Sequence, residues 1–208
     1  MTTEKAFLLN IGPVGRAASL HTRSGLGRAK SGCELCGLHT RCKSPRMEPH
    51  GNGKLGIYII GQSPGMTEDD EGRQFIGESG EFLEKRLASQ GISIDEDCWL
   101  DNAVQCCPGK RKVDAKHIRA CHPRVVKHIE TFKPSLILAL GAEAMQSIFQ
   151  GLPLAPVMSM RGRLIPSHEF GVWVAPLLHP SYVLRQGEPK DLIKLYNRDI
   201  KHALEVLD

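Results

Sequence analysis

Short apolar runs alternate with amphipathic stretches along this chain from about residue 55 onward. The first run, residues 56–61, is rich in isoleucine and ends in glycine, as buried β-strands commonly do. Three later runs of the same kind predict further strands at residues 98–104, 135–140 and 172–178. Between and after them, apolar residues recur at helical spacing and predict helices at residues 80–90, 114–132, 142–150 and 191–207.

The alternation of strands with helices predicts an α/β protein with a mostly parallel, four-stranded central sheet that is covered by helices on both faces. In such sheets, functional residues gather in the loops that follow the carboxyl ends of the strands. Those loops begin near Gly61, Asn102, Gly141 and His179. Inside the long helix, Pro123 removes a backbone donor, so we expect a kink or a break there.

The length of 208 residues suits one compact domain, residues 32–208, preceded by a flexible basic arm, residues 1–31. An apolar content of 41% and a charged content of 24% exclude a wholly disordered chain. The longest apolar runs are far shorter than a membrane-spanning helix, and the first residues lack the apolar core of a signal peptide. We therefore expect an intracellular, cytoplasmic protein with no membrane partner.

The net charge of +4 is small, but basic and acidic residues are unevenly distributed along the chain. Residues 1–46 and 101–128 are rich in lysine and arginine, whereas residues 66–97 are rich in aspartate and glutamate. A basic face beside an acidic loop suits a polyanionic partner and a separate active site. Ordinary solvated surface charge is the alternative interpretation of the same distribution.

Seven cysteines in a chain without an export signal favour metal ligation or buried thiols over disulfide bonds. Cys33 and Cys36 form a Cys-x2-Cys pair, which is a strong ligand signal, and Cys106 and Cys121 follow singly. Four thiolates from separated segments favour a 4Fe-4S cluster, because a zinc ribbon would use a second close pair. Zinc is the alternative, followed by a redox pair. Three cysteines stay unassigned: Cys42, Cys98 and Cys107.

The loop after the first strand, residues 61–80, is rich in glycine and carries four acidic residues ahead of Phe75. Its glycines allow backbone N–H groups to approach a ligand closely. The loop matches neither the Gly-Lys-Ser/Thr loop that binds nucleoside triphosphates nor the Gly-x-Gly-x-x-Gly turn that binds dinucleotides. It is therefore either a ligand-binding loop of another kind or a plain chain reversal.

The loop after the last predicted strand begins with His179. A histidine fixed at a strand end is well placed to donate a hydrogen bond to developing negative charge, although a lone histidine also serves purely structural roles. Two polar members of the loop, Ser181 and Arg185, suit phosphate groups. Its apolar members are either core residues or a wedge that enters a base stack: Tyr182, Val183 and Leu184.

Several of these segments together resemble the family 4 iron–sulfur uracil-DNA glycosylases. The matching motifs are Gly-Gln-Ser-Pro-Gly at residues 61–65, Glu-Asp at 68–69, Gly-Arg-Gln-Phe-Ile-Gly at 72–77, Asn-Ala-Val-Gln-Cys-Cys-Pro at 102–108 and His-Pro-Ser-Tyr-Val-Leu-Arg at 179–185. With the four ligand cysteines, the resemblance covers residues 30–207. It implies a three-layer α/β/α sandwich and a glycosylase of base excision repair, which hydrolyses the N-glycosidic bond of flipped-out deoxyuridine and leaves an abasic site.

The resemblance also implies roles for individual residues in the base pocket. The pocket floor corresponds to Ser63, Pro64 and Gly65. Phe75 matches the aromatic residue that stacks on the flipped base, and Asn102 matches the amide that reads its polar edge. His179 matches the histidine beside uracil O2, where it stabilises the departing base anion.

Further matches concern the cluster and the DNA. The cluster ligands correspond to Cys33, Cys36, Cys106 and Cys121. Residues 181–185 match the loop that enters the DNA helix as the base leaves, and a neighbouring basic loop suits phosphate contacts. The residues expected to contact DNA are Lys110, Arg111, Lys112, Ser181, Tyr182, Val183, Leu184 and Arg185.

The sequence departs from the family pattern at two places. The family carries a glutamate where this chain has Gln62, which can hold a water molecule but cannot take its proton. Glu68 is the best remaining carboxylate, so the expected catalytic residues are His179, Gln62 and Glu68. The second departure is the basic loop at residues 109–114, where a uracil-trapping branch of the superfamily has its bond-forming histidine near Asp114. With aspartate there, we expect no covalent trapping.

Our leading prediction is a monofunctional glycosylase, because no lysine in the motifs suggests Schiff-base chemistry. We expect it to act as a monomer on uracil-containing DNA, single- or double-stranded. The alternative is a weakly active or inactive relative that binds uracil or single-stranded DNA through the same pocket, because the family's acid is replaced by Gln62. A third interpretation keeps the reaction but extends it to other deaminated bases.

Overall fold

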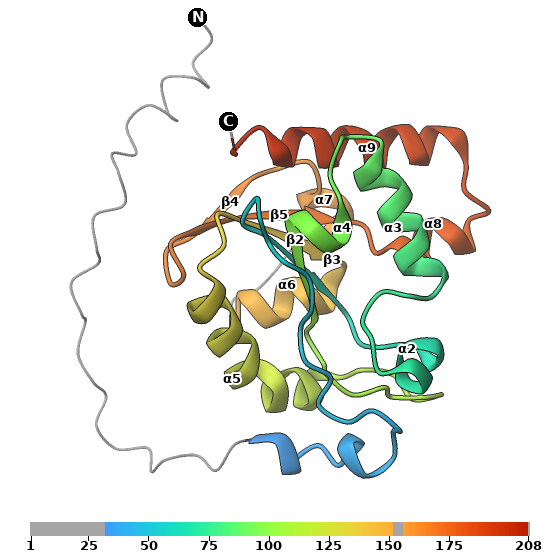
Figure 1. Ribbon diagram of the computed structural model, residues 1–208, viewed down its shortest axis with the longest axis vertical. Coiled ribbons are helices and arrows are strands. Elements are labelled where there is room, and N and C mark those ends of the chain that lie inside the picture. Colours follow the sequence, from blue (N-terminus) through green and yellow to red (C-terminus); the bar gives the residue numbers. More distant parts are fainter. Residues whose placement is uncertain (1–31, 152–155, 208) are drawn as a thin grey trace, which may run out of the picture. The chain divides into compact units, whose positions relative to one another are not determined.

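The structure is a computed structural model that describes residues 32–151 and 156–207. The arm predicted at residues 1–31 lies outside the described residues and stays a prediction. In the described part, strands and helices alternate as the hydrophobic pattern predicts (Figure 1). None of the helices in this part is both long enough and apolar enough to cross a membrane.

Within the described residues, five strands form one central sheet. They are β1 (Ile57–Gly61), β2 (Cys98–Asn102), β3 (Leu136–Leu140), β4 (Ile165–Ser167) and β5 (Val172–Leu177), in the order β2-β1-β3-β5-β4. Neighbouring strands pair in parallel except β4, which pairs antiparallel with β5 at the edge. The four predicted strands are confirmed, and β4 is one strand more than predicted. Its three residues include Pro166, which suits an edge strand, and they are too few to show a hydrophobic period.

The helices and 3-10 turns connect these strands. In chain order they are η1 (Gly32–Glu34), η2 (Leu38–Thr40), α2 (Met66–Glu71), α3 (Glu78–Ala88), α4 (Ile94–Asp97), α5 (Ala115–Phe132), α6 (Ala142–Ile148), α7 (Val157–Met160), α8 (Pro180–Arg185) and α9 (Lys190–Leu204). The break considered at Pro123 does not occur, since α5 continues to Phe132. Cys121 and Val125, on either side of the proline, are both buried, and this packing holds the helix together.

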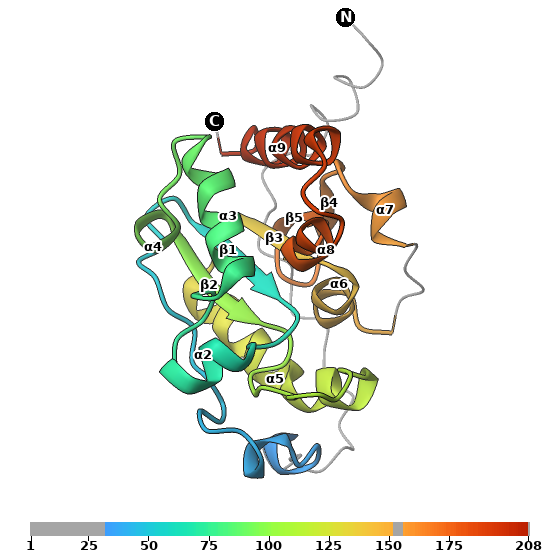
Figure 2. The ribbon, with the colours of Figure 1, turned by 90° about the vertical axis from the view of Figure 1, so that its right-hand side faces the viewer.

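Helices cover both faces of the sheet and so form the predicted three layers (Figure 2). Because successive strand residues point to opposite faces, Ile57 and Ile59 pack with α3, α8 and α9. Tyr58 and Ile60 instead pack with α5 and α6. All four side chains are fully buried, which explains why β1 is apolar along its whole length rather than at alternate positions.

The parallel register brings the ends of distant strands to one edge of the sheet. In the pairing of β1 with β2, Gly61 lies opposite Asn102. On the other side, the N–H of Gly141 donates to the carbonyl of Leu177 (2.9 Å), which joins the loop after β3 to the end of β5. The four loops singled out by the sequence therefore start at the same edge, where α/β proteins place their sites.

Helix α3 packs directly on the loop that carries Phe75, and Gly80 makes this close approach possible. A Cβ atom at Gly80 would lie 1.8 Å from the backbone oxygen of Phe75. We expect Gly80→Ala to lower the free energy of unfolding by about 2 kcal/mol, because helix and loop must move apart. Urea denaturation measures this loss, with Glu81→Ala on the exposed side of the same helix as the control. A Gly80→Ala variant as stable as the wild type would contradict the contact.

Candidate active site

A cavity of about 740 Å³ lies at the carboxyl edge of the parallel strands. Its walls come from the loops and helix starts that follow β1, β2, β3 and β5. A volume of this size is usual for a pocket that binds a small molecule or a single base. Its lining includes every residue predicted for catalysis or base contact: Gln62, Ser63, Pro64, Gly65, Glu68, Phe75, Asn102 and His179.

Gly61, Phe75 and Asn102 meet at one wall of this cavity. A Cβ atom at Gly61 would lie 2.4 Å from Asn102 Oδ1 and 2.8 Å from Phe75 Cζ, so the wall needs glycine. Phe75 has a φ of 56°, in the left-handed region that bulky residues rarely adopt. Such strain persists only where the surroundings hold the residue, and it is frequent at ligand sites. The wall therefore presents a fixed aromatic ring next to an amide.

A buried polar network holds the end of β2. Asp101 is fully buried and accepts hydrogen bonds from the Tyr58 hydroxyl (2.5 Å) and from His128 Nδ1 (2.8 Å). Its other oxygen accepts the backbone N–H of Asn102 (2.7 Å). Burial, reinforced by the Asp101 carboxylate, raises the pKa of Tyr58, so its hydroxyl remains a donor. The network thereby fixes the backbone from which the Asn102 side chain enters the cavity.

Glu68 lies in the first turn of α2, and both of its carboxylate oxygens accept backbone hydrogen bonds. Oε2 accepts the N–H of Gly65 (3.0 Å) and Oε1 accepts the N–H of Gly77 (2.8 Å). Such charge-assisted bonds are stronger than neutral ones, so Glu68 ties two loops of the cavity together. This geometry favours a bracing role over the water-orienting role predicted from the sequence.

His179 precedes α8 at the end of β5 and lines the cavity. Its Nδ1 atom accepts the backbone N–H of Ser181 (3.2 Å) and lies 2.9 Å from Ser181 Oγ. Because Nδ1 is an acceptor, the neutral ring carries its proton on Nε2. Burial, followed by the positive charge of Arg185, lowers the pKa of His179 from 6.5 to about 4. At neutral pH the ring is therefore an uncharged hydrogen-bond donor.

The basic and polar residues predicted to contact DNA lie at the surface around the cavity. Arg111, Lys112 and Ser181 line it, and Lys110 is exposed on the same loop as Arg111. Arg185 is also exposed and donates to Ser181 Oγ (3.0 Å). These positions are compatible with phosphate contacts at the cavity mouth.

The apolar residues of α8 are placed differently from one another. Val183 is fully buried in the core shared with α3 and α9. Tyr182 and Leu184 are partly buried against the same core. The structure therefore favours a packing role for Val183 over the DNA contact predicted for it, and leaves Tyr182 and Leu184 partly accessible.

Three of the four predicted ligand cysteines lie in or against one small apolar core near the start of α5, and Cys33 is connected to it through Arg46. Cys106 and Cys121 are buried there, and Cys33 and Cys36 are partly buried. Arg46 connects two of them, since its backbone N–H donates to Cys106 Sγ (3.2 Å) and its Nε donates to Cys33 Sγ (2.9 Å). Across residues 32–151 and 156–207, no three His, Cys, Asp or Glu side chains are arranged to hold a single metal ion.

The other three cysteines have different surroundings. Cys42 packs in the same core, and burial, followed by the nearby Cys106, raises its pKa to about 12. Cys98 is buried in β2, where burial also raises its pKa to about 12. Cys107 lines the cavity, with its Sγ 3.8 Å from Met66 Sδ.

Sequence reasoning did not single out three residues that the structure places at these sites. Gln74 is buried behind Asn102 and accepts a hydrogen bond from its Nδ2. Arg46 bonds the cysteines, and Glu143 of α6 lines the cavity. Gln74 lies in the motif at residues 72–77, next to Phe75, and this position could have marked it as a residue near the base pocket. The roles of Arg46 and Glu143 depend on tertiary contacts that leave no local pattern.

Comparison with known proteins identifies a matching family and several relatives. The family profile described as the uracil DNA glycosylase superfamily matches residues 48–201. A type-4 uracil-DNA glycosylase from Thermotoga maritima is 33% identical over an alignment that covers 82% of this chain and 87% of the relative. Type-4 uracil-DNA glycosylases from Pyrobaculum aerophilum and Archaeoglobus fulgidus are each 30% identical, covering 83% and 84% of this chain and 92% and 87% of the relatives.

The low pKa of His179 predicts a loss of stability in mild acid. Between pH 6.5 and pH 4 the unfolded chain takes up a proton at this histidine, whereas the folded chain does not. The contribution of His179 to the free energy of unfolding is therefore full above pH 6.5 and falls by about 3 kcal/mol as the pH approaches 4.

Urea denaturation at a series of pH values measures this effect. The comparison is wild type against His179→Gln, which does not titrate and should lose less stability toward pH 4. Equal pH dependence of the two proteins would show that His179 titrates normally. An NMR titration of its Cε1–H signal gives an independent value for the same pKa.

Proposed function

Because this chain belongs to the uracil-DNA glycosylase superfamily, we propose that it hydrolyses the N-glycosidic bond of flipped-out deoxyuridine in DNA and leaves an abasic site for base excision repair. The observation that carries the proposal is the neutral His179 ring, which shares one cavity with Phe75 and Asn102. An aromatic face, an amide and a hydrogen-bond donor are the groups needed to hold a uracil base and to release it as an anion.

Phe75 and Asn102 account for recognition of the base. The Phe75 ring stacks on the pyrimidine, while Asn102 Oδ1 accepts from uracil N3–H and Asn102 Nδ2 donates to uracil O4. Cytosine presents an acceptor at N3 and a donor at N4, so the same amide would leave buried polar groups mismatched. Flipping the base out of the duplex costs a few kcal/mol, which stacking in the pocket offsets.

His179 acts on the leaving base. As the glycosidic bond breaks, negative charge develops on uracil O2, and the Nε2–H of His179 donates a hydrogen bond to it. The ring starts neutral and keeps its proton, so it stabilises the anion as a donor and does not transfer a proton to it. The base then leaves as an anion.

The residues near the attacking water molecule activate it only weakly. Gln62 lines the cavity, and its backbone is fixed because its carbonyl accepts the N–H of Val104 (3.0 Å). Its amide orients a water molecule by hydrogen bonds but takes no proton, and the Glu68 carboxylate is already engaged by Gly65 and Gly77. Because the sugar becomes oxocarbenium-like before water attacks, a weakly activated water suffices.

The reaction that we propose is monofunctional. A strand-cleaving lyase would need a lysine amine held at the sugar C1′ carbon. Among the described residues that line the cavity, the single lysine is Lys112, and it is exposed on the basic loop. With Lys110 and Arg111, it is better placed to contact phosphate groups. Ser181 and Arg185 provide a second phosphate contact at the start and end of α8.

The cysteine core fits a 4Fe-4S cluster by its donor chemistry. Cys33, Cys36, Cys106 and Cys121 would hold it with four thiolates, and Arg46 donates N–H bonds to two of these sulfurs. When bound, the cluster would supply rigidity, because its ligands would come from η1 and the turn after it, from the loop between β2 and α5, and from α5 itself. The basic residues that contact DNA lie on that loop. Zinc on the same thiols is the alternative.

A labelled oligonucleotide with one deoxyuridine tests the proposed reaction. Wild-type protein should give strand cleavage only after alkali treatment, which reveals an abasic site. His179→Ala should lower the single-turnover rate by about 10²- to 10³-fold, the usual cost of removing one donor to a developing oxyanion. His168→Ala, in the exposed turn after β4, is the matched control and should react like the wild type.

Three other outcomes would change the proposal. Cleavage without alkali would show lyase activity, and loss of that cleavage in Lys112→Ala would identify the amine. Uracil-dependent retention of the DNA without cleavage would favour the weakly active binding relative. Excision of hypoxanthine or xanthine from matched oligonucleotides would extend the substrates to other deaminated bases.

Elemental analysis of cysteine variants tests the cluster. The wild type should be brown and contain four iron atoms per chain, and Cys36→Ser or Cys121→Ser should lose most of the iron. Cys42→Ser is the matched control, because this thiol packs in the same core but is not one of the proposed ligands. Iron loss in the control would make Cys42 a ligand, and a colourless protein with one zinc per chain would replace the cluster with a zinc site.

A further inference from the structure

We propose that Gln74 determines the preference for uracil over cytosine by fixing which way the Asn102 amide faces. The inference rests on the proposed function, in which Asn102 reads the polar edge of the base. Gln74 does not line the cavity, so it is a positioning residue that acts through Asn102.

The contact between these two side chains is fully enclosed. Asn102 is 3% exposed and Gln74 is 1% exposed, so no water replaces a hydrogen bond lost between them. The Nδ2 of Asn102 donates to Oε1 of Gln74. One of the two amide hydrogens is thereby used, which leaves the second hydrogen and Oδ1 for the base.

The other end of Gln74 determines its own orientation. Its Nε2 donates to the backbone carbonyl of Met47 (3.5 Å). A backbone carbonyl can only accept, so Nε2 must face Met47 and Oε1 must face Asn102. The direction of both amides therefore follows from one backbone carbonyl.

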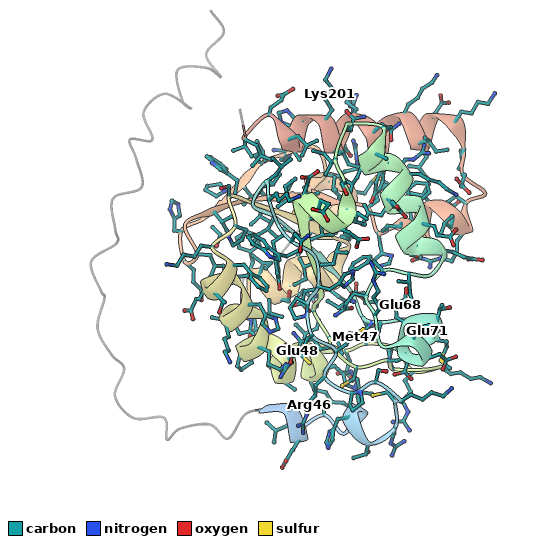
Figure 3. All side chains as sticks on the ribbon, in the orientation of Figure 1. Arg46, Met47, Glu48, Glu68, Glu71 and Lys201 are labelled. Carbon is teal, nitrogen blue, oxygen red and sulfur yellow. The ribbon has the colours of Figure 1, made fainter. Side chains whose placement is uncertain are left out.

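That carbonyl is itself held in place. The N–H of Met47 donates to the carbonyl of Gln105 (2.8 Å), and the N–H of Arg46 donates to Cys106 Sγ (3.2 Å). Figure 3 shows Arg46, Met47 and Glu48 between the N-terminal 3-10 turns and the rest of the fold. Glu48 forms an ion pair with Arg124 of α5. Successive residues of this segment are thus bonded to different parts of the molecule.

A rotated Asn102 amide would exchange its donor and acceptor. It would then present a donor toward N3 and an acceptor toward position 4 of the base, which is the pattern that matches cytosine. The rotation would also bring Asn102 Oδ1 against Gln74 Oε1, two acceptors without a proton between them. If Gln74 rotated as well, its Oε1 would face the Met47 carbonyl with the same result. Rotation of Asn102 alone, or of Asn102 and Gln74 together, leaves buried acceptors unpaired. The structure therefore disfavours the Asn102 orientation that would match cytosine.

Two oligonucleotides that resist cleavage test the inference, one with 2′-fluorodeoxyuridine and one with 2′-fluorodeoxycytidine. Wild-type protein should bind the uracil form more tightly. In Gln74→Leu, which keeps the volume but removes both hydrogen bonds, the ratio of the two dissociation constants should fall by about 10- to 100-fold. Gln146→Leu, on an exposed position of α6, is the matched control and should keep the wild-type ratio.

A second variant separates the orientation of the Asn102 amide from the packing of the side chain at position 74. Gln74→Glu, when its buried carboxyl is protonated, offers the same acceptor to Asn102 and an O–H donor to Met47. The preference should therefore survive in this variant, and it should persist as the carboxyl ionises, because a carboxylate still accepts from Asn102 Nδ2. Loss of the preference in Gln74→Glu would contradict the inference. This rescue also covers the case in which Gln74→Leu does not fold.

The dependence on Asn102 gives the decisive comparison. If Gln74 acts through this amide, then Gln74→Leu combined with Asn102→Ala should show the same uracil-to-cytosine ratio as Asn102→Ala alone. An additive effect, or a Gln74→Leu protein with the wild-type ratio, would overturn the inference. A wild type that binds the uracil form selectively but never releases uracil would refute the proposed reaction and leave the role of Gln74 supported.

Discussion

The parallel pairing of β1 with β2 is the constraint on which the rest of the site depends. It places Gly61 opposite Asn102, at the ends of two strands whose other residues are buried apart from the partly buried Trp99. A slip of one residue would turn Asn102 toward the opposite face of the sheet. Asp101 opposes such a slip, because only the present register gives its buried carboxylate the hydrogen bonds of Tyr58 and His128. Removal of such a partner leaves a buried charge without compensation.

The electrostatic character of the cavity follows from burial and backbone donors. Its buried carboxylate, Glu68, is balanced by two N–H groups, and its histidine, His179, is held neutral. A site of this kind is suited to accept negative charge that appears during a reaction, since the Nε2–H donor of His179 is already in place. It offers less to a developing positive charge on a sugar. In the reaction that we propose, the site therefore stabilises the departing base more than the sugar.

The local sequence pattern was sufficient to predict some of the strands and cavity residues, but not others. The strands β1, β2, β3 and β5 are predictable because buried parallel strands are continuous apolar runs. The shared location of Phe75, Asn102 and His179 at one cavity could be predicted because each lies in a motif at or after a strand end. The roles of Glu68 and Val183 could not be predicted from the sequence. Glu68 joins two loops and Val183 lies on the buried side of a short helix, and both positions depend on tertiary packing. For the same reason, α5 continues through Pro123 although local chemistry suggests an interruption.

The cavity is assembled from loops that follow four different strands, and this has a consequence for how the newly made chain matures. No single crossover unit contains the aromatic ring, the amide and the histidine together, since Phe75 and Asn102 belong to the unit from β1 to β2, whereas His179 follows β5. Parallel pairing between such distant segments forms late, after long loops have closed. A chain in which β5 has not yet paired with β3 therefore lacks the histidine side of the pocket. The complete pocket is present only once β5 has joined the sheet.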